Sequence, residues 1–199
     1  MDRQRLSPDD SDQPIPIYTV GYGERSLDAF IEVLRAYDVG YLIDIRSAPY
    51  SRYKPEFSKR TLEDALRRHG IRYVFMGRTL GGRPTDPECY SGEKVDYEKV
   101  KRKDFYQEGI ERIRNAFKQQ QCIVLMCSEG KPEHCHRSKL IGETLTELEI
   151  PVRHIDEKGE LKSQTEVINI LTGGQLSLFG RHTFTSSKRY STEESADDV

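Results

Sequence analysis

Residues 127–137 hold the side chains best suited to chemistry in this chain. They read CSEGKPEHCHR, with two cysteines, two histidines and an arginine, and they directly follow the apolar run CIVLM of residues 122–126. Because short apolar runs of this kind are typical of buried strands, we expect Cys127 to end a strand and a helix to begin near Arg137. A thiol placed there is close to the N–H groups and dipole of the following helix, which lower its pKa and favour the nucleophilic thiolate.

We predict that this segment binds an anionic group beside a polarised thiol. Cys127 is the candidate nucleophile or proton carrier, and Glu129 is a candidate general acid–base. His136 and Arg137 add positive charge, and a guanidinium group can bind a phosphate through two parallel hydrogen bonds. The arrangement resembles that of cysteine phosphatases and rhodaneses, although their loop places the arginine much closer to the cysteine. The alternative is a cysteine that only ends a buried strand, as a small apolar side chain.

A metal site is a second interpretation of the same segment. Cys127, Cys135 and His136 are residue types that bind zinc or iron. Their spacing differs from the C-x2-C pair of zinc ribbons, and no second pair stands nearby in the sequence. We therefore predict no metal or other cofactor, with zinc or iron at these three residues as the alternative. A reversible disulfide between the two cysteines is the redox form of that alternative.

A basic and aromatic segment follows the second expected strand. Residues 46–60 read RSAPYSRYKPEFSKR, in which five basic and three aromatic residues stand against one acidic residue. Cations contact phosphates and aromatic rings stack on bases, so the segment suits a nucleotide or a single-stranded nucleic acid. We predict that Arg46, Arg52 and Lys54 bind phosphate, and that Asp44 is a candidate general acid–base if burial raises its pKa. The alternative is a surface loop pinned to the core by its aromatic side chains.

Strand and helix patterns alternate along the chain. We expect strands at residues 17–20, 41–45, 71–76, 122–126 and 151–155. We expect helices with apolar faces at residues 27–34, 62–66, 104–119 and 138–148. The alternation predicts an α/β fold, a single three-layer domain with a mainly parallel sheet of about five strands flanked by helices. Ligands of such sheets bind beyond the carboxyl ends of the strands, where we expect Gly81 and Gly82 to join the two segments above.

The two ends of the chain differ in composition from its centre. Residues 1–15 and 172–199 are polar and acidic, so we expect a disordered N-terminal tail, an α/β domain over 16–171 and a flexible C-terminal tail. The longest uncharged apolar run, at 122–127, is too short to span a bilayer, so no membrane association is expected. The first residues lack the apolar core of a signal peptide, which predicts a cytoplasmic protein with reduced cysteines.

Four motifs resemble the domain-of-unknown-function family numbered 488. They are TVGYGERSLDAF, LIDIRSAPYSRYKPEFSKRTLEDALRRHGIRY, LGGRP and the element CSEG…CHR, which occur in the family's order over roughly residues 16–156. The resemblance implies a site made of ten residues: Asp44, Arg46, Arg52, Gly81, Gly82, Cys127, Glu129, Cys135, His136 and Arg137. Gly23 departs slightly from the family pattern, because serine is common at that position. The resemblance does not supply a substrate.

A short peptide near the C-terminus has a pattern of its own. Residues 175–179 read QLSLF and resemble the pentapeptide by which many bacterial proteins dock on the DNA polymerase sliding clamp. Leu178 and Phe179 would enter an apolar pocket, while Gln175 would make polar contacts at its edge and Leu176 completes the pattern. Glycines on both sides leave the peptide free to adapt. The alternative is a short amphipathic strand that packs on the domain.

These features predict a nucleotide- or nucleic-acid-directed protein of DNA metabolism or repair, recruited by the bacterial sliding clamp. As an enzyme it would be a cysteine-dependent hydrolase that acts on a phosphoester or glycosidic bond. The alternatives are a non-catalytic module that recognises a nucleotide or DNA, and the metal or redox site described above. A metal-dependent nuclease is disfavoured, because such enzymes assemble several carboxylates around magnesium and only Asp44 and Glu129 are evident here.

Overall fold

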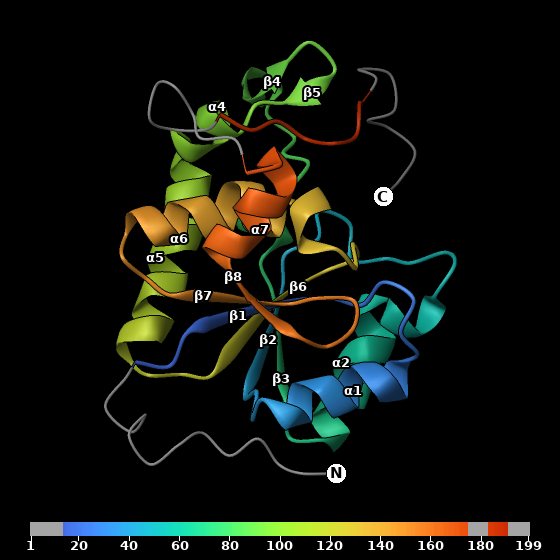
Figure 1. The fold of residues 1–199 in the computed structure, drawn as a ribbon. Coiled ribbons are helices and arrows are strands. Elements are labelled where there is room, and N and C mark those ends of the chain that lie inside the picture. The colour runs from blue at the N-terminus through green and yellow to red at the C-terminus, as the bar shows by residue number, and fades with distance from the viewer. Residues whose placement is uncertain (1–13, 175–182, 191–199) are drawn as a thin grey trace.

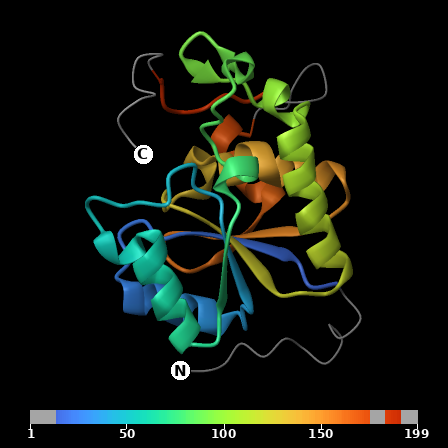
Figure 2. The same ribbon diagram turned by 180° about the vertical axis from the view of Figure 1, so that it is seen from behind.

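A six-stranded sheet forms the centre of the molecule, which a computed structural model describes over residues 14–174 and 183–190 (Figures 1 and 2). The strand order is β3-β2-β6-β1-β7-β8. The bounds are β1 Ile17–Gly21, β2 Tyr41–Asp44, β3 Arg72–Phe75, β6 Ile123–Cys127, β7 Val152–Ile155 and β8 Leu161–Ser163. The first five strands of this order are parallel, and β8 is antiparallel to β7. The predicted α/β fold with a mainly parallel sheet is confirmed.

Helices cover both faces of the sheet. Helices α1 and α2 lie on one face, and α5, α6 and α7 lie on the other (Figures 1 and 2). Their bounds are α1 Leu27–Ala36, α2 Lys59–Arg68, α5 Asp104–Lys118, α6 Glu143–Glu147 and α7 Gln164–Thr172. Short elements complete the described chain: α3 Gly77–Leu80, α4 Tyr97–Lys101, the hairpin β4 Tyr90–Ser91 and β5 Lys94–Val95, and single turns at Pro55–Phe57, Pro87–Cys89 and Pro132–His134. The helix expected at 138–148 is divided into a π-helical segment, Arg137–Gly142, and α6.

The central strands β2 and β6 carry apolar side chains on both faces. Leu42 and Met126 pack with the apolar residues of α1 and α2. Ile43, Leu125 and Cys127 point the other way, into the cluster that includes α5 and the helical segment before α6. A parallel sheet covered on both faces needs such continuous apolar strands, which is why the short apolar runs of the sequence locate them correctly.

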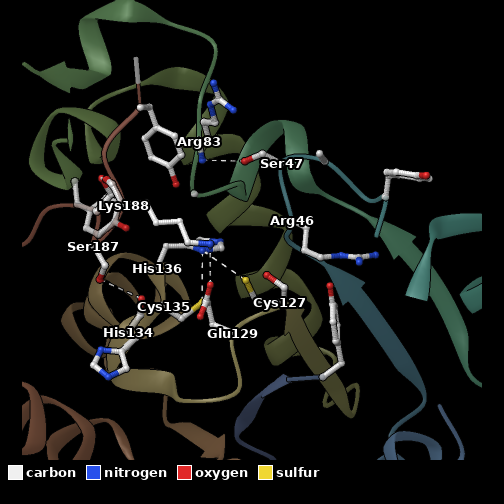
Figure 3. A pocket seen from close by; sticks show the side chains of 18 residues that line it. Arg46, Ser47, Arg83, Cys127, Glu129, His134, Cys135, His136, Ser187 and Lys188 are labelled. Carbon is white, nitrogen blue, oxygen red and sulfur yellow. Dashed lines mark hydrogen bonds and ion pairs between the residues drawn. The ribbon is translucent and has the colours of Figure 1, made fainter. Parts of the chain in front are cut away.

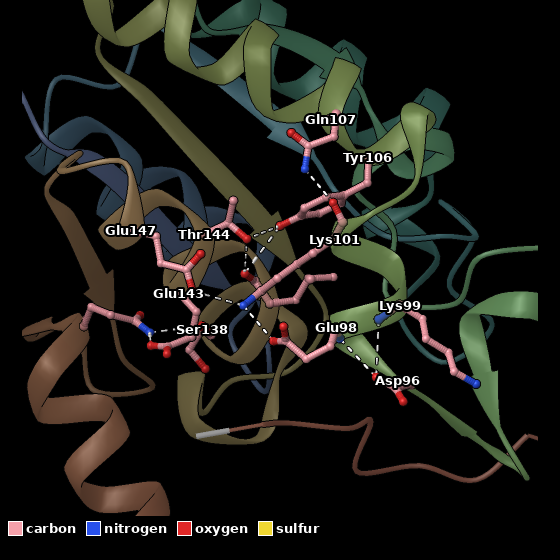
Figure 4. Close-up of polar contacts among 12 residues, drawn as sticks. Asp96, Glu98, Lys99, Lys101, Tyr106, Gln107, Ser138, Glu143, Thr144 and Glu147 are labelled. Carbon is pink, nitrogen blue, oxygen red and sulfur yellow. Dashed lines mark hydrogen bonds and ion pairs between the residues drawn. The ribbon is translucent and has the colours of Figure 1, made fainter. Parts of the chain in front are cut away.

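Polar contacts join α4 and α5 to α6 (Figure 4). The Tyr106 hydroxyl lies 2.9 Å from Thr144 Oγ1 within the buried core. Lys101 Nζ lies 2.9 Å from Glu98 Oε1 and 3.3 Å from Glu147 Oε1, so one cation bridges α4 and α6. These contacts attach α6, which follows the segment after Cys127, to α4 and α5.

Residues 183–190 lie against the β4–β5 hairpin, although the sequence places them in the flexible tail of 172–199. Ser186 is buried and exchanges two hydrogen bonds with Val95, from Val95 N to Ser186 Oγ and from Ser186 N to Val95 O. Lys139 Nζ donates to the Thr185 carbonyl and to the hydroxyl of Ser187. The clamp-like peptide 175–179 lies outside the described residues. Among the described helices, none has the length and apolar character that a bilayer crossing requires.

His154 on β7 is a completely buried imidazole held between two side chains. Its Nδ1 lies 2.7 Å from Thr19 Oγ1 and its Nε2 lies 2.6 Å from Gln164 Oε1. The amide oxygen only accepts, so Nε2–H donates to it and Nδ1 accepts from the Thr19 hydroxyl. Burial, together with the positive charge of Arg137, lowers the pKa of His154 to about 3. The folded state therefore requires a neutral ring.

We expect this ring to make the protein less stable in mild acid. A pKa of about 6.5 in the unfolded chain and about 3 in the folded chain gives stability that is present above pH 6.5 and lost as pH falls. At about pH 5 the loss is about 2 kcal/mol, because each unit below 6.5 costs about 1.4 kcal/mol. Urea unfolding at about pH 7 and about pH 5 should show this extra loss in wild type relative to His154→Gln. Equal losses of unfolding free energy in the two proteins would contradict the lowered pKa of His154.

Candidate functional site

A pocket with a volume of about 350 Å³ opens beyond the carboxyl ends of three strands (Figure 3). Tyr22 follows β1, Arg46 follows β2 and Cys127 ends β6, so neighbouring parallel strands bring these residues to one place. Residues 183–190 form part of its wall. Open α/β sheets bind ligands at this edge, and the sequence places the site there as well.

The floor of the pocket consists of two cysteines and a histidine. Cys127, Cys135 and His136 are all buried, and all three line the pocket. His136 Nδ1 lies 3.9 Å from Cys127 Sγ and 3.6 Å from Cys135 Sγ. The other ring nitrogen, Nε2, lies 3.2 Å from the Ile45 carbonyl oxygen, which can only accept. Nε2 therefore carries the proton in the neutral ring, and the lone pair of Nδ1 faces the two sulfurs.

The two floor cysteines differ in their affinity for a proton. A hydrogen bond from Cys135 lowers the pKa of Cys127 well below its usual range against the opposing effect of burial, with help from His136 and the backbone N–H of Glu129. Burial and the neighbouring Cys127 sulfur raise the pKa of Cys135. Within this pair, Cys127 is therefore the cysteine that gives up its proton more readily. A thiolate is the reactive form of cysteine, both as a nucleophile and as a metal ligand.

Gly82 lets the backbone approach the histidine of the floor closely. A Cβ atom at Gly82 would lie 2.7 Å from His136 Nδ1, closer than side chains tolerate. The position lines the pocket, so the missing side chain leaves space above the ring nitrogen. The neighbouring Gly81 is buried and does not line the pocket; there a Cβ would lie 2.2 Å from the Gly77 carbonyl oxygen. Of the two glycines named from the sequence, one faces the pocket and the other packs behind it.

Arg137 lies beneath the loop that follows β6 and not in the pocket. Its side chain is fully buried, and its two Nη atoms donate over 2.7 Å to the carbonyl oxygens of Glu129 and Gly130. Gly21 packs against the same point, where a Cβ would overlap the Glu129 carbonyl. The sequence assigns Arg137 to phosphate, whereas the structure gives it the role of shaping the loop. The reason is that buried carbonyls of a long loop need donors, and Arg137 supplies them.

Asp44 also lies outside the pocket lining, as the partner of Arg46. The carboxylate is fully buried and accepts Nε and Nη2 of Arg46, at 2.9 and 2.6 Å, and the Tyr73 hydroxyl at 2.6 Å. Both oxygens are thus occupied, and the expected acid–base role gives way to positioning. Arg46 Nη2 also donates to the Phe57 carbonyl, while the buried Nη1 has no hydrogen-bond partner among the residues described. Arg46 is thus a pocket-lining cation with a spare donor.

The other two cations named from the sequence lie away from the pocket. Arg52 is exposed, and it does not line the pocket. Lys54 Nζ donates over 2.9 Å to the carbonyl oxygen of Arg25, which ties the basic loop to the turn after β1.

Several pocket residues were not identified from the sequence. Arg83 lines the pocket beside Gly82, and its guanidinium carbon lies 4.9 Å from the centre of the Tyr190 ring. Lys188 lies at the pocket mouth, where its Nζ is 3.1 Å from Glu129 Oε1 (Figure 3). Tyr22 contributes another aromatic ring to the rim. The sequence gives a signal only for Arg83, which follows the two glycines of LGGRP.

The comparison with known families adds a finding of its own. A family model described as "Domain of unknown function DUF488" matches residues 26–143, more than half of the 199 residues. The chain belongs to this family. Among curated proteins, none matches the sequence. The pocket floor of this DUF488 protein lies within the matched region, whereas Tyr22, Lys188 and Tyr190 lie outside it. Part of the rim is therefore supplied by segments beyond the matched family region.

We expect Arg137→Met to destabilise the protein by about 2 to 4 kcal/mol, because two buried carbonyls lose charge-assisted donors. Arg67→Met is the matched control, since Arg67 is exposed and pairs with Asp64 on its own helix. That change should cost less than about 0.5 kcal/mol. Urea unfolding measures both, and amide exchange over residues 128–136 should accelerate only in Arg137→Met. Similar stability and exchange in the two variants would contradict the role given to Arg137.

Proposed function

We propose that this DUF488 protein is a nucleotide- or nucleic-acid-directed hydrolase that binds a phosphate group in the pocket above Cys127. The supporting observation is the combination of a buried cysteine–histidine floor with a cationic and aromatic rim in one pocket. Bond cleavage would involve a phosphoester or a glycosidic bond of the bound nucleotide. Cys127 is the floor residue on which the reaction depends.

The charge of the rim supports an anionic ligand. Arg46, Arg83 and Lys188 line the pocket, and Glu129 is the single acidic residue among its described lining residues. Arg46 is buried and already paired with Asp44, yet its Nη1 keeps an unused donor. A phosphate oxygen can satisfy such a donor, and guanidinium groups bind phosphate well. A phosphate that enters the pocket can also replace Glu129 as the ion-pair partner of Lys188. The released Glu129 carboxylate would then act as the proton carrier at the pocket mouth.

The aromatic residues support a base or another planar group. Tyr50 lines the pocket and is 70% exposed, and Tyr53 further along the same loop is 93% exposed. Their exposed rings are available to stack on a planar ligand. Stacking on an aromatic ring contributes about 1–3 kcal/mol per base and tolerates any sequence. The basic residues of the same loop, including the exposed Arg52, would follow a nucleic-acid backbone.

We expect Arg83→Ala to weaken binding of a nucleoside monophosphate or a short single-stranded oligonucleotide by about tenfold or more, since it removes one charge-assisted contact. Arg68→Ala is the control, because Arg68 is exposed on α2 and does not line the pocket. Calorimetric titration measures both. Unchanged affinity in Arg83→Ala, or equal losses in the two variants, would contradict the phosphate site.

The Cys127→Ser variant distinguishes a hydrolase from a non-catalytic recognition module. In a hydrolase, Cys127→Ser should abolish turnover of the bound nucleotide and leave its affinity within about threefold. In a non-catalytic module the same change should leave nucleotide binding almost unchanged. Binding by the wild-type protein without cleavage of any phosphoester or glycosidic bond tested would favour the module.

We also propose that residues 175–179 dock this protein on a bacterial sliding clamp. The support is the complete QLSLF pattern and its position, two residues after Gly173, whose left-handed conformation (φ 62°) ends α7. A fluorescent peptide of residues 170–183 should bind the clamp with a Kd of about tens of micromolar or tighter. Replacement of Leu178 and Phe179 by alanine should remove binding, because the apolar anchors are lost. Absence of wild-type binding up to about 100 µM would refute clamp docking.

A further inference from the structure

The floor of the pocket collects three metal-ligand side chains from two places in the chain. Cys127 ends β6, whereas Cys135 and His136 follow the turn at Pro132–His134. Their ligand atoms all lie within 4.8 Å of one another. Four-coordinate zinc has bonds of about 2.3 Å to sulfur and about 2.0 Å to nitrogen, which places neighbouring ligand atoms about 3.5 Å apart. The observed separations of 3.6 and 3.9 Å between sulfur and Nδ1 are close to this value.

We propose that Cys127, Cys135 and His136 bind a zinc-class divalent metal ion, with its fourth coordination position open to the pocket. Sulfur and imidazole donors select zinc or ferrous iron over magnesium and calcium, which prefer oxygen. Glu129 does not belong to the ligand set, because it pairs with Lys188 at the pocket mouth. Three protein ligands with one open position are typical of catalytic zinc, whereas structural zinc has four.

The surroundings of His136 are organised as those of a metal ligand. Its Nε2 donates to the Ile45 carbonyl, and this fixes both the ring orientation and the tautomer that leaves Nδ1 free to bind a cation. Metal-bound histidines commonly have such an outer hydrogen bond to a carbonyl or carboxylate. Gly82 keeps a side chain away from Nδ1, where a Cβ would lie at 2.7 Å. The space next to the three donor atoms therefore remains open toward the pocket.

A metal ion at this position would supply chemistry for the proposed hydrolysis. The metal site itself is argued from the three ligand side chains and not from the proposed function. An ion at this position would bind a water molecule or a phosphate oxygen at its open site, below the cationic rim. Zinc lowers the pKa of a bound water to about 7, which makes hydroxide available near neutral pH. Cys127 would then serve the reaction as a ligand, and loss of turnover in Cys127→Ser would follow from loss of the ion.

The test is the metal content of untagged protein purified under reducing conditions and measured by mass spectrometry. We expect about one zinc or iron ion per chain. Cys127→Ser, Cys135→Ser and His136→Ala should each lose it. Cys122→Ser is the control and should keep it, because Cys122 hydrogen-bonds to the Tyr37 carbonyl and lies outside the cluster. A metal-free wild type that also fails to take up added zinc would overturn the proposal.

Two further measurements avoid any dependence on variants that fail to fold. Wild-type protein stripped by a chelator should bind one equivalent of cobalt(II) and show the visible bands of tetrahedral thiolate ligation. A Cys127–Cys135 disulfide that forms when air oxygen replaces the reductant and opens again when the reductant is restored, with no cobalt binding, would establish the redox alternative instead. Bound metal without nucleotide affinity would refute only the proposed hydrolase, and nucleotide hydrolysis without metal would refute only the metal site.

Discussion

The guanidinium group of Arg137 supports the loop on which the pocket is built. Glu129 and Gly130 turn their carbonyl oxygens inward, and Arg137 donates to both from a fully buried position. The loop can pass so close to β1 only because Gly21 has no side chain. With the loop held in this way, Cys127 at its start and Cys135 at its end come together at the carboxyl edge of the sheet. Burying this charge is costly, but leaving the two inward carbonyl oxygens without donors would also be costly, so Arg137 and the loop depend on each other.

The neighbouring strand supplies the other half of the floor. The backbone after β2 continues in register with β6, since Ile45 N donates to the Met126 carbonyl. The Ile45 carbonyl is then free to accept from His136 and set the orientation of its ring. One residue further, Arg46 is held by Asp44 beside the pocket. Sheet register therefore fixes the spacing between the floor and one cation of the rim.

The sequence located the residues that regular structure positions, but it did not reveal the tertiary contacts of the other predicted residues. The apolar run before Cys127 located the end of β6, because a strand covered on both faces must be apolar throughout. Arg137 was misplaced because its charge indicates affinity for anions but not which side of a loop it occupies. Asp44 was given an acid–base role because composition cannot reveal that Arg46 and Tyr73 use both of its oxygens.

Residues 183–190 show a second limit of sequence reasoning. Their return to the domain depends on hydrogen bonds of Ser186 with Val95, which leave no apolar periodicity to detect. Lys188 and Tyr190 reach the pocket as a consequence of that return. The rim is thus built from parts of the chain more than a hundred residues apart, and only the three-dimensional structure brings them together.

Charge balance connects the floor of the pocket to its rim. A bare thiolate on Cys127 would repel a phosphate dianion at short range, because two negative charges in a partly buried site are poorly screened. A divalent ion bound by two thiolates has no net charge and offers its open position to an oxygen ligand. The positive charges of Arg46, Arg83 and Lys188 would then not be opposed by a negative charge on the floor. An anionic substrate is therefore easier to reconcile with the proposed metal-bound floor than with a free thiolate.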